Sequence, residues 1–228
     1  MKRTKRSSFK AVGLGVAGLA AAQGVQATTE ITFEGFTGDN VDISTLPGYG
    51  SNVSASNSDY AVSLGATGVL GTPDITLTWG VGYQTYTAWD GRGNVAQTDF
   101  NFGNPITLTL TPSASTGVLI TSFNLDEWDG GGVMSVSWDI SDTSGSLASG
   151  TWNKDDPGGR DTVVTGLTLG DVNVGAPVTL SFNLNSGLVS YIALDNLIFD
   201  QVPEPSTLAL ALLGGVGLGA AAMRRRRR

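Results

Sequence analysis

The side chains in this sequence that could carry chemistry are mostly carboxylates, because the chain contains no histidine and no cysteine. Their absence excludes Ser-His-Asp and Cys-His catalysis, the usual zinc ligand sets and a histidine general base. Enzymes that use a pair of carboxylates, such as those that cleave glycosidic bonds, remain open. No disulfide can brace the fold.

Three tryptophans stand beside acidic residues at predicted turns. Trp89 and Trp128 each begin a Trp-Asp-Gly triplet, and Trp152 is followed after two residues by two aspartates. An aromatic ring on a loop can stack on the apolar face of a sugar while a neighbouring carboxylate accepts hydrogen bonds from its hydroxyls. We predict glycan contact at these three rings. The alternative is that loops bury them at the rim of the core.

The first 27 residues have the features of an export signal. Five basic residues lie among the first ten, residues 11–22 are apolar, and Val25-Gln26-Ala27 offers a small-residue cleavage site. The mature chain should begin near Thr28 after cleavage by signal peptidase. A Lys-Arg pair stands where a twin-arginine signal has two arginines, so the general secretory route is favoured and the twin-arginine route is the alternative.

The chain ends in an uncharged segment, residues 207–223, followed by the five arginines Arg224, Arg225, Arg226, Arg227 and Arg228. As a helix this segment would extend roughly 25 Å, barely enough to span a bilayer. Arginines are costly to translocate, so the C-terminus should stay in the cytoplasm while the preceding domain lies outside. We expect a transmembrane helix here.

The motif Pro203, Glu204 and Pro205, the Gly/Ala/Leu-rich span and the terminal arginines together resemble the PEP-CTERM sorting signal of Gram-negative bacteria that make extracellular polysaccharide. The resemblance implies an exosortase partner, a membrane transpeptidase-like enzyme that cuts near the motif. It implies a precursor anchored in the inner membrane and a mature domain in the periplasm, at the cell surface or in the extracellular matrix. A plain membrane anchor with a chance Pro-Glu-Pro is the alternative.

The segment between the two signals is strongly acidic. Residues 28–202 contain nineteen acidic residues and three basic ones, Arg92, Lys154 and Arg160, for a net charge of −16. Such a domain would repel a phosphate backbone, so nucleic acid is excluded as a partner. Cations, calcium above all, are its natural charged partners outside the cell.

Apolar and polar residues alternate with a period of two in four segments of this domain: 75–79, 106–111, 134–140 and 178–184. This pattern predicts strands with one buried face. Seven further strands are expected at 30–36, 60–64, 83–88, 95–102, 118–125, 160–165 and 189–199, with glycine-rich turns between several of them. The sequence therefore predicts an all-β chain: one antiparallel sandwich over residues 28–201, of jelly-roll type, between a signal helix (1–27) and a sorting signal with a transmembrane helix (202–228).

The opening segment 31–36 and the closing segment 191–199 resemble the terminal strands of galactose-binding-like jelly rolls and of many PEP-CTERM cargo domains. The resemblance implies that the two terminal strands are neighbours and that Glu34 and Asp195 help to hold a structural calcium ion. Backbone carbonyls and residues such as Asp39, Asn40 or Asp42 would have to complete its shell. The alternative is that both acids are polar strand-end residues.

The function expected from these features is a non-catalytic surface or matrix protein that binds exopolysaccharide. Two alternatives stay open. One is a carbohydrate-active enzyme with paired carboxylates, and the other is a structural scaffold that binds no small ligand.

Overall fold

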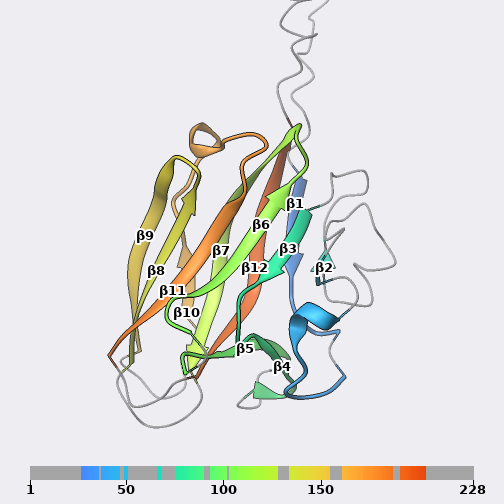
Figure 1. The fold of residues 1–228 in the computed structure, drawn as a ribbon, viewed down its shortest axis with the longest axis vertical. Coiled ribbons are helices and arrows are strands. Elements are labelled where there is room, and N and C mark those ends of the chain that lie inside the picture. Colours follow the sequence, from blue (N-terminus) through green and yellow to red (C-terminus); the bar gives the residue numbers. More distant parts are fainter. Residues whose placement is uncertain are drawn as a thin grey trace, which may run out of the picture.

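The computed structural model describes residues 27–35, 37–46, 49–50, 66–67, 75–89, 93–101, 103–127, 134–154, 161–186 and 191–203. Within these ranges the chain forms twelve strands and two 3-10 helices, η1 (Ile43–Thr45) and η3 (Leu169–Asp171). The strands form two sheets that face each other (Figure 1). The prediction of an all-β antiparallel sandwich is confirmed.

The two sheets have seven and five strands, and their neighbouring strands pair antiparallel. The seven-stranded sheet contains β1 (Ala27–Ile31), β2 (Ala66–Thr67), β4 (Gln84–Tyr86), β5 (Val95–Asp99), β7 (Thr116–Glu127), β10 (Asp161–Val164) and β12 (Tyr191–Pro203). The five-stranded sheet contains β3 (Ile75–Trp79), β6 (Ile106–Pro112), β8 (Met134–Asp142), β9 (Gly145–Lys154) and β11 (Val178–Ser186).

The core lies between the sheets and is built by the period-two alternation of the strands. In β6 every second side chain is buried, and β8 repeats the pattern from Met134 to Ile140. The chain passes from one sheet to the other between β6 and β7, between β7 and β8, and between β9 and β10. After β10 it enters the smaller sheet as β11 and returns to the larger sheet as β12. Phe123 of the larger sheet packs edge-on against Trp138 and Phe182 of the smaller one, with ring centroids 5.8 and 5.7 Å apart.

β12 is the strand on which the larger sheet is assembled. It pairs with β7 along one side, and on the other side with β5 through its first residues and with β1 through its last. The expectation that the terminal strands are neighbours is confirmed. The expected boundaries of the first strand are wrong, because β1 ends at Ile31 and Phe33 adopts a left-handed φ of 58° that an extended strand cannot continue through.

The two ends of β12 lie at opposite ends of the sandwich. Its first residues adjoin β5, next to β4, and its last residues pair with the start of β1, where Ala27 lies opposite Gln201. Figure 1 shows β4, β5 and η1 at the lower end of the molecule and the end of β12 beside β1 at the upper end.

No helix among the described residues has the length and apolar character needed to cross a membrane. The predicted signal helix, apart from Ala27, and the predicted membrane span at 207–223 lie outside the described residues. Ala27 itself is the first residue of β1.

Candidate functional site

A hollow of about 210 Å³ opens beside β4, β5 and the start of β12. We call it the aromatic pocket. It is lined by Asn40, Tyr86, Trp89, Gln97 and Tyr191. Three rings and two carboxamides thus converge on one small space. Such a mixture of apolar surface and a few oriented polar groups is typical of small-molecule sites, although this hollow is below the usual range of about 300–1,000 Å³.

The pocket lies on the face of the larger sheet that points away from the core. Ala96, Ile192 and Leu194 belong to the core, so the alternating residues Gln97 and Ala193 project from the opposite face. Gln97 and Ala193 lie opposite each other in the pairing of β5 with β12. The pocket is therefore built on a sheet rather than on loops alone, which holds its lining residues in register.

The loop that carries Asn40 is fastened to β4 by several hydrogen bonds. The Asn40 backbone N–H donates to the Thr85 carbonyl at 2.7 Å, and the Thr85 N–H donates to the Val41 carbonyl at 2.9 Å. The backbone N–H and the hydroxyl of Thr87 both donate to the Asp39 carboxylate at 2.6 Å. Across the pocket, Gln97 Nε2 donates to Asn40 Oδ1 at 2.9 Å, which orients both amides.

Trp89 supports the pocket from beneath. Its side chain is fully buried in a small cluster with Val95 and Ala193, against which Tyr86 packs. The Tyr86 and Trp89 rings meet edge to face, with centroids 5.5 Å apart. A ring with no exposed face is not placed to stack on a sugar, so the exposed aromatic surface belongs to Tyr86 and Tyr191.

Tyr191 forms the accessible wall of the pocket, with 41% of its surface exposed. It lies opposite Asp99 in the strand pairing. The negative charge of Asp99, together with the hydrogen bond between the two side chains, raises the pKa of Tyr191. Asp99 also accepts a 2.8 Å hydrogen bond from the Asn101 backbone N–H. Tyr191 therefore stays protonated at neutral pH and is held by a buried carboxylate.

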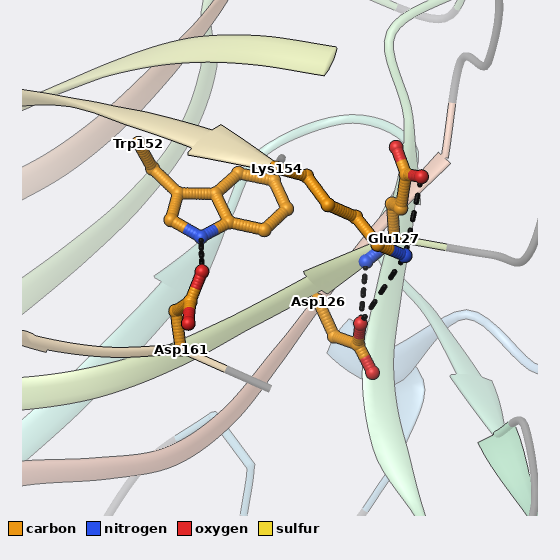
Figure 2. Close-up of polar contacts among 5 residues, drawn as sticks. All are labelled: Asp126, Glu127, Trp152, Lys154 and Asp161. Atoms are coloured by element: carbon orange, nitrogen blue, oxygen red, sulfur yellow. Dashed lines mark hydrogen bonds and ion pairs between the residues drawn. The ribbon is translucent and has the colours of Figure 1, made fainter. Parts of the chain in front are cut away.

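A second polar cluster joins the two sheets along one edge (Figure 2). Lys154, only 5% exposed, places its Nζ 3.1 Å from Glu127 Oε1 and 4.0 Å from Asp126 Oδ1. Both carboxylates are buried, and Glu127 Oε2 has no hydrogen-bond partner among the described residues. One cation thus serves two buried anions. We call this the Lys154 cluster.

Trp152 lies next to the Lys154 cluster and not at an exposed loop. It belongs to the core, with 5% of its surface exposed, and its indole N–H donates to Asp161 Oδ2 at 2.8 Å (Figure 2). This bond connects β9 of the smaller sheet with β10 of the larger one. The placement favours a structural role over the predicted glycan contact. Trp128, the remaining predicted glycan contact, lies outside the described residues.

The two predicted calcium ligands sit in different surroundings, because Glu34 lies in the turn after β1 and Asp195 lies within β12. Glu34 is exposed, its backbone carbonyl accepts from Asn94 Nδ2 at 3.1 Å, and its carboxylate lies over Gly93. Asp195 is 3% exposed. The described residues contain no group of three or more His, Cys, Asp or Glu side chains arranged to hold a metal. Calcium binding stays a prediction.

The oxygens expected to complete the calcium shell make hydrogen bonds that hold the segment between β1 and η1. Asp39 accepts from Thr87, and Asn40 accepts from Gln97. Asp42 caps η1 by accepting from the Ser44 N–H at 2.9 Å. These bonds explain the polar residues of the loop without a metal.

Of the sorting motif, Pro203 is the last residue of β12 and lies opposite Thr116. Glu204, Pro205 and residues 224–228 lie outside the described residues. The sequence pointed to Trp89 but not to Tyr86, Gln97 or Tyr191, which are common strand residues without a motif. Asn40 was noted only as a calcium ligand.

The solved structures to which the chain is similar include a cyclase and a protein named CtCBM11. The Stig cyclase Fisc from Fischerella sp. TAU, in complex with an indole compound, is 15% identical, covering 78% of this chain and 99% of that chain with a TM-score of 0.41. CtCBM11, solved in solution, is 10% identical, covering 80% and 98%, with a TM-score of 0.29. At these values neither likeness carries an argument about function.

No curated protein matches the chain. One family model does match, the PEP-CTERM protein-sorting motif, over residues 201–228. The match begins two residues before Pro203 and contains the whole predicted signal. The C-terminal end of this chain is therefore a PEP-CTERM protein-sorting motif, the tail of an exosortase substrate.

Proposed function

We propose that this protein is a non-catalytic, exported β-sandwich of the jelly-roll, galactose-binding-like type that binds exopolysaccharide through the aromatic pocket. The observation that carries the proposal is the placement of the pocket relative to the sorting tail. Tyr191 begins β12 and Pro203 ends it. The 13 residues of this strand extend roughly 40 Å at about 3.3 Å per residue.

A chain tethered through its C-terminal tail would therefore hold the pocket at the end of the sandwich away from the membrane. The tail follows directly on the paired end of β12, so the sandwich has no long linker through which to turn back. A binding site at the distal end suits a protein that contacts the matrix around the cell. In this route signal peptidase acts at the N-terminus and exosortase at the C-terminus, and the arginines hold the precursor's C-terminus in the cytoplasm.

The chemistry of the pocket also suits a sugar. The exposed Tyr191 ring, and Tyr86 behind it, offer apolar surface to the C–H face of a pyranose. Asn40 and Gln97 offer carbonyl and amide groups to its hydroxyls. The volume of about 210 Å³ is small for a drug-sized ligand, so we expect one sugar unit of a chain to enter and its neighbours to lie outside.

The Lys154 cluster supports a non-catalytic reading over a glycosidase. Cleavage of a glycosidic bond needs two carboxylates about 5–10 Å apart across an open cleft. Asp126 and Glu127 are adjacent on β7, are buried, and share Lys154. Both carboxylates reach the same Lys154 Nζ and are closed off from solvent, so neither faces an open cleft that a sugar chain could enter.

The experiment is isothermal titration of the full-length chain, in a zwitterionic detergent that contains no sugar, with a panel of bacterial exopolysaccharide fragments. Tyr191→Ala should weaken binding about five- to tenfold, the loss expected for one stacking ring. Tyr191→Phe should keep most of the affinity. Val164→Ala, a change at an exposed position of β10, is the control and should have no effect.

Equal binding by Tyr191→Ala and the unchanged chain would refute the pocket as the site. Absence of binding to every fragment would refute glycan binding and leave the scaffold alternative. Thermal unfolding of the same chain in calcium chloride and in EDTA tests the predicted calcium ion. The unfolding midpoint should rise with calcium, and Glu34→Ala or Asp195→Ala should abolish that rise. Turnover of any fragment would contradict the non-catalytic proposal.

A further inference from the structure

Two carboxylates adjoin residues that line the aromatic pocket. Asp99 lies opposite Tyr191 and hydrogen-bonds to it, and it is 6% exposed. Asp39 precedes the pocket residue Asn40 and holds Thr87, the residue after Tyr86. Asp99 is thus one hydrogen bond away from a pocket residue, and Asp39 is one residue away from another. They act on a bound ligand through their charge rather than through direct contact.

Hydrogen bonds hold both carboxylates in place beside the pocket. Asp39 accepts from the hydroxyl and the backbone N–H of Thr87, and these bonds lower its pKa, the side-chain bond having the larger effect. Asp99 accepts from the Asn101 N–H and pairs with the Tyr191 hydroxyl, whose pKa the negative charge of Asp99 raises.

No described cation offsets these charges. Lys154 is the single basic residue in the part of the chain that the structure describes. It is already shared between Glu127 and Asp126 in the Lys154 cluster. The pocket thus presents oriented dipoles and rings close to two carboxylates, whose negative charge repels an anionic ligand.

Resting on the proposed function, we infer that the aromatic pocket selects uncharged sugar units and discriminates against uronic acids and other carboxylated sugars. A carboxylate about 10 Å from one uncompensated charge, at an effective dielectric constant of about 40, is disfavoured roughly fourfold. Asp39 is exposed to solvent, so its charge is screened and adds less than that of Asp99. The protein should therefore adhere to neutral stretches of the surrounding polysaccharide.

The experiment compares ligands that differ only in this charge. Gluco-, galacto- and manno-trisaccharides are each titrated alongside their C6-oxidised forms, in which CH₂OH is replaced by COO⁻. The full-length chain is used, in zwitterionic detergent at low ionic strength. In any pair that binds, we expect the neutral trisaccharide to bind at least about fourfold more tightly than its oxidised form. In 0.5 M salt the ratio of the two affinities should become smaller, because salt screens the charges.

Asp99→Asn tests the source of the discrimination. The amide oxygen can still accept from the Asn101 N–H and from Tyr191, so the neutral sugar should bind within about twofold of the unchanged chain while the discrimination falls by half or more. The matched control is Asp142→Asn. Asp142 accepts from the N–H of Ser144, two residues on, as Asp99 does from Asn101, but it ends β8 of the other sheet. Its removal should leave the ratio unchanged.

The outcomes separate the inference from the proposed function. A neutral ligand bound more tightly than its oxidised partner, with a ratio that falls in salt and in Asp99→Asn, supports both. Equal or tighter binding of the oxidised partner overturns the inference alone; if Arg92→Ala abolishes that binding, a cation from outside the described residues recognises the acid. Binding of neither partner in all three pairs overturns the selectivity together with the proposed glycan binding.

Discussion

Replacing Lys154 with methionine should destabilise the fold strongly, because it leaves two buried carboxylates without their cation. The Lys154 Nζ lies 3.1 Å from Glu127 and 4.0 Å from Asp126, and all three side chains are at most 5% exposed. Methionine matches the length of the aliphatic stem, so the packing contribution is largely kept. What remains is the cost of leaving Glu127 and Asp126 buried without the nearby cation.

The expected loss is about 3–5 kcal/mol at pH 7, the range for breaking a buried ion pair by removing one partner. A comparable pair on the surface would contribute about 0–1 kcal/mol, so the measurement distinguishes the two situations. Small domains have a total free energy of unfolding of about 5–15 kcal/mol. The variant should therefore lose about a fifth of its stability or more.

Urea unfolding at pH 7, followed by tryptophan fluorescence, is the assay. The double variant Lys154→Met with Glu127→Gln should recover part of the loss, because it removes one of the two buried charges that lose their cation. A loss below about 1 kcal/mol for Lys154→Met would refute the reasoning, because the charges would then be solvated.

Three further predictions concern stability and the pocket loop. Tyr83→Phe should raise the free energy of unfolding in urea by about 1 kcal/mol, because the Tyr83 hydroxyl is buried without a hydrogen-bond partner among the described residues. A lower free energy of unfolding would show that the hydroxyl is bonded after all. Gly150→Ala should cost about 1–3 kcal/mol in the same assay, since a Cβ there would lie 2.6 Å from the Trp138 ring; an unchanged midpoint would contradict that contact. Asp39 should titrate below 3.8, because bonds from Thr87 stabilise its charged form, so its stabilising effect is present above that pH and is lost as the pH falls through its lowered pKa. The amide shift of Thr87 should report this titration and stop doing so in Asp39→Asn; a midpoint at or above 3.8 would contradict the bond.

Local sequence pattern predicted most strands but missed β9 and the two-residue β2, and the strand predicted at 60–64 lies outside the described residues. The alternation in β3, β6, β8 and β11 predicted strands at their observed places. β9, with the sequence GSLASGTWNK, has no such alternation and carries two glycines. It is a strand because it pairs with β8 over its whole length, and Gly150 is required where Trp138 lies across it. Pairing of this kind is a tertiary effect that propensity does not report.

The aromatic pocket shows the same division between local and long-range information. Its residues come from positions 40, 86, 89, 97 and 191, and they meet because β5 pairs with both β4 and β12. The repeated Trp-Asp-Gly triplet drew attention to Trp89, but the burial of that ring under Tyr86 depends on Val95 and Ala193 packing against it. Exposure of an aromatic ring is decided by its neighbours in space.

The sequence by itself determined the all-β fold class of this protein and its C-terminal sorting motif. Period-two alternation specifies strands with one buried face wherever they pair, and the sorting motif is a contiguous signal that needs no fold to be read. The tertiary structure decided which polar residues meet: Asn40 with Gln97, Asp99 with Tyr191, and Lys154 with two acids. These contacts join residues far apart in the chain, and their geometry follows from strand register, which is set by the packing of the whole core.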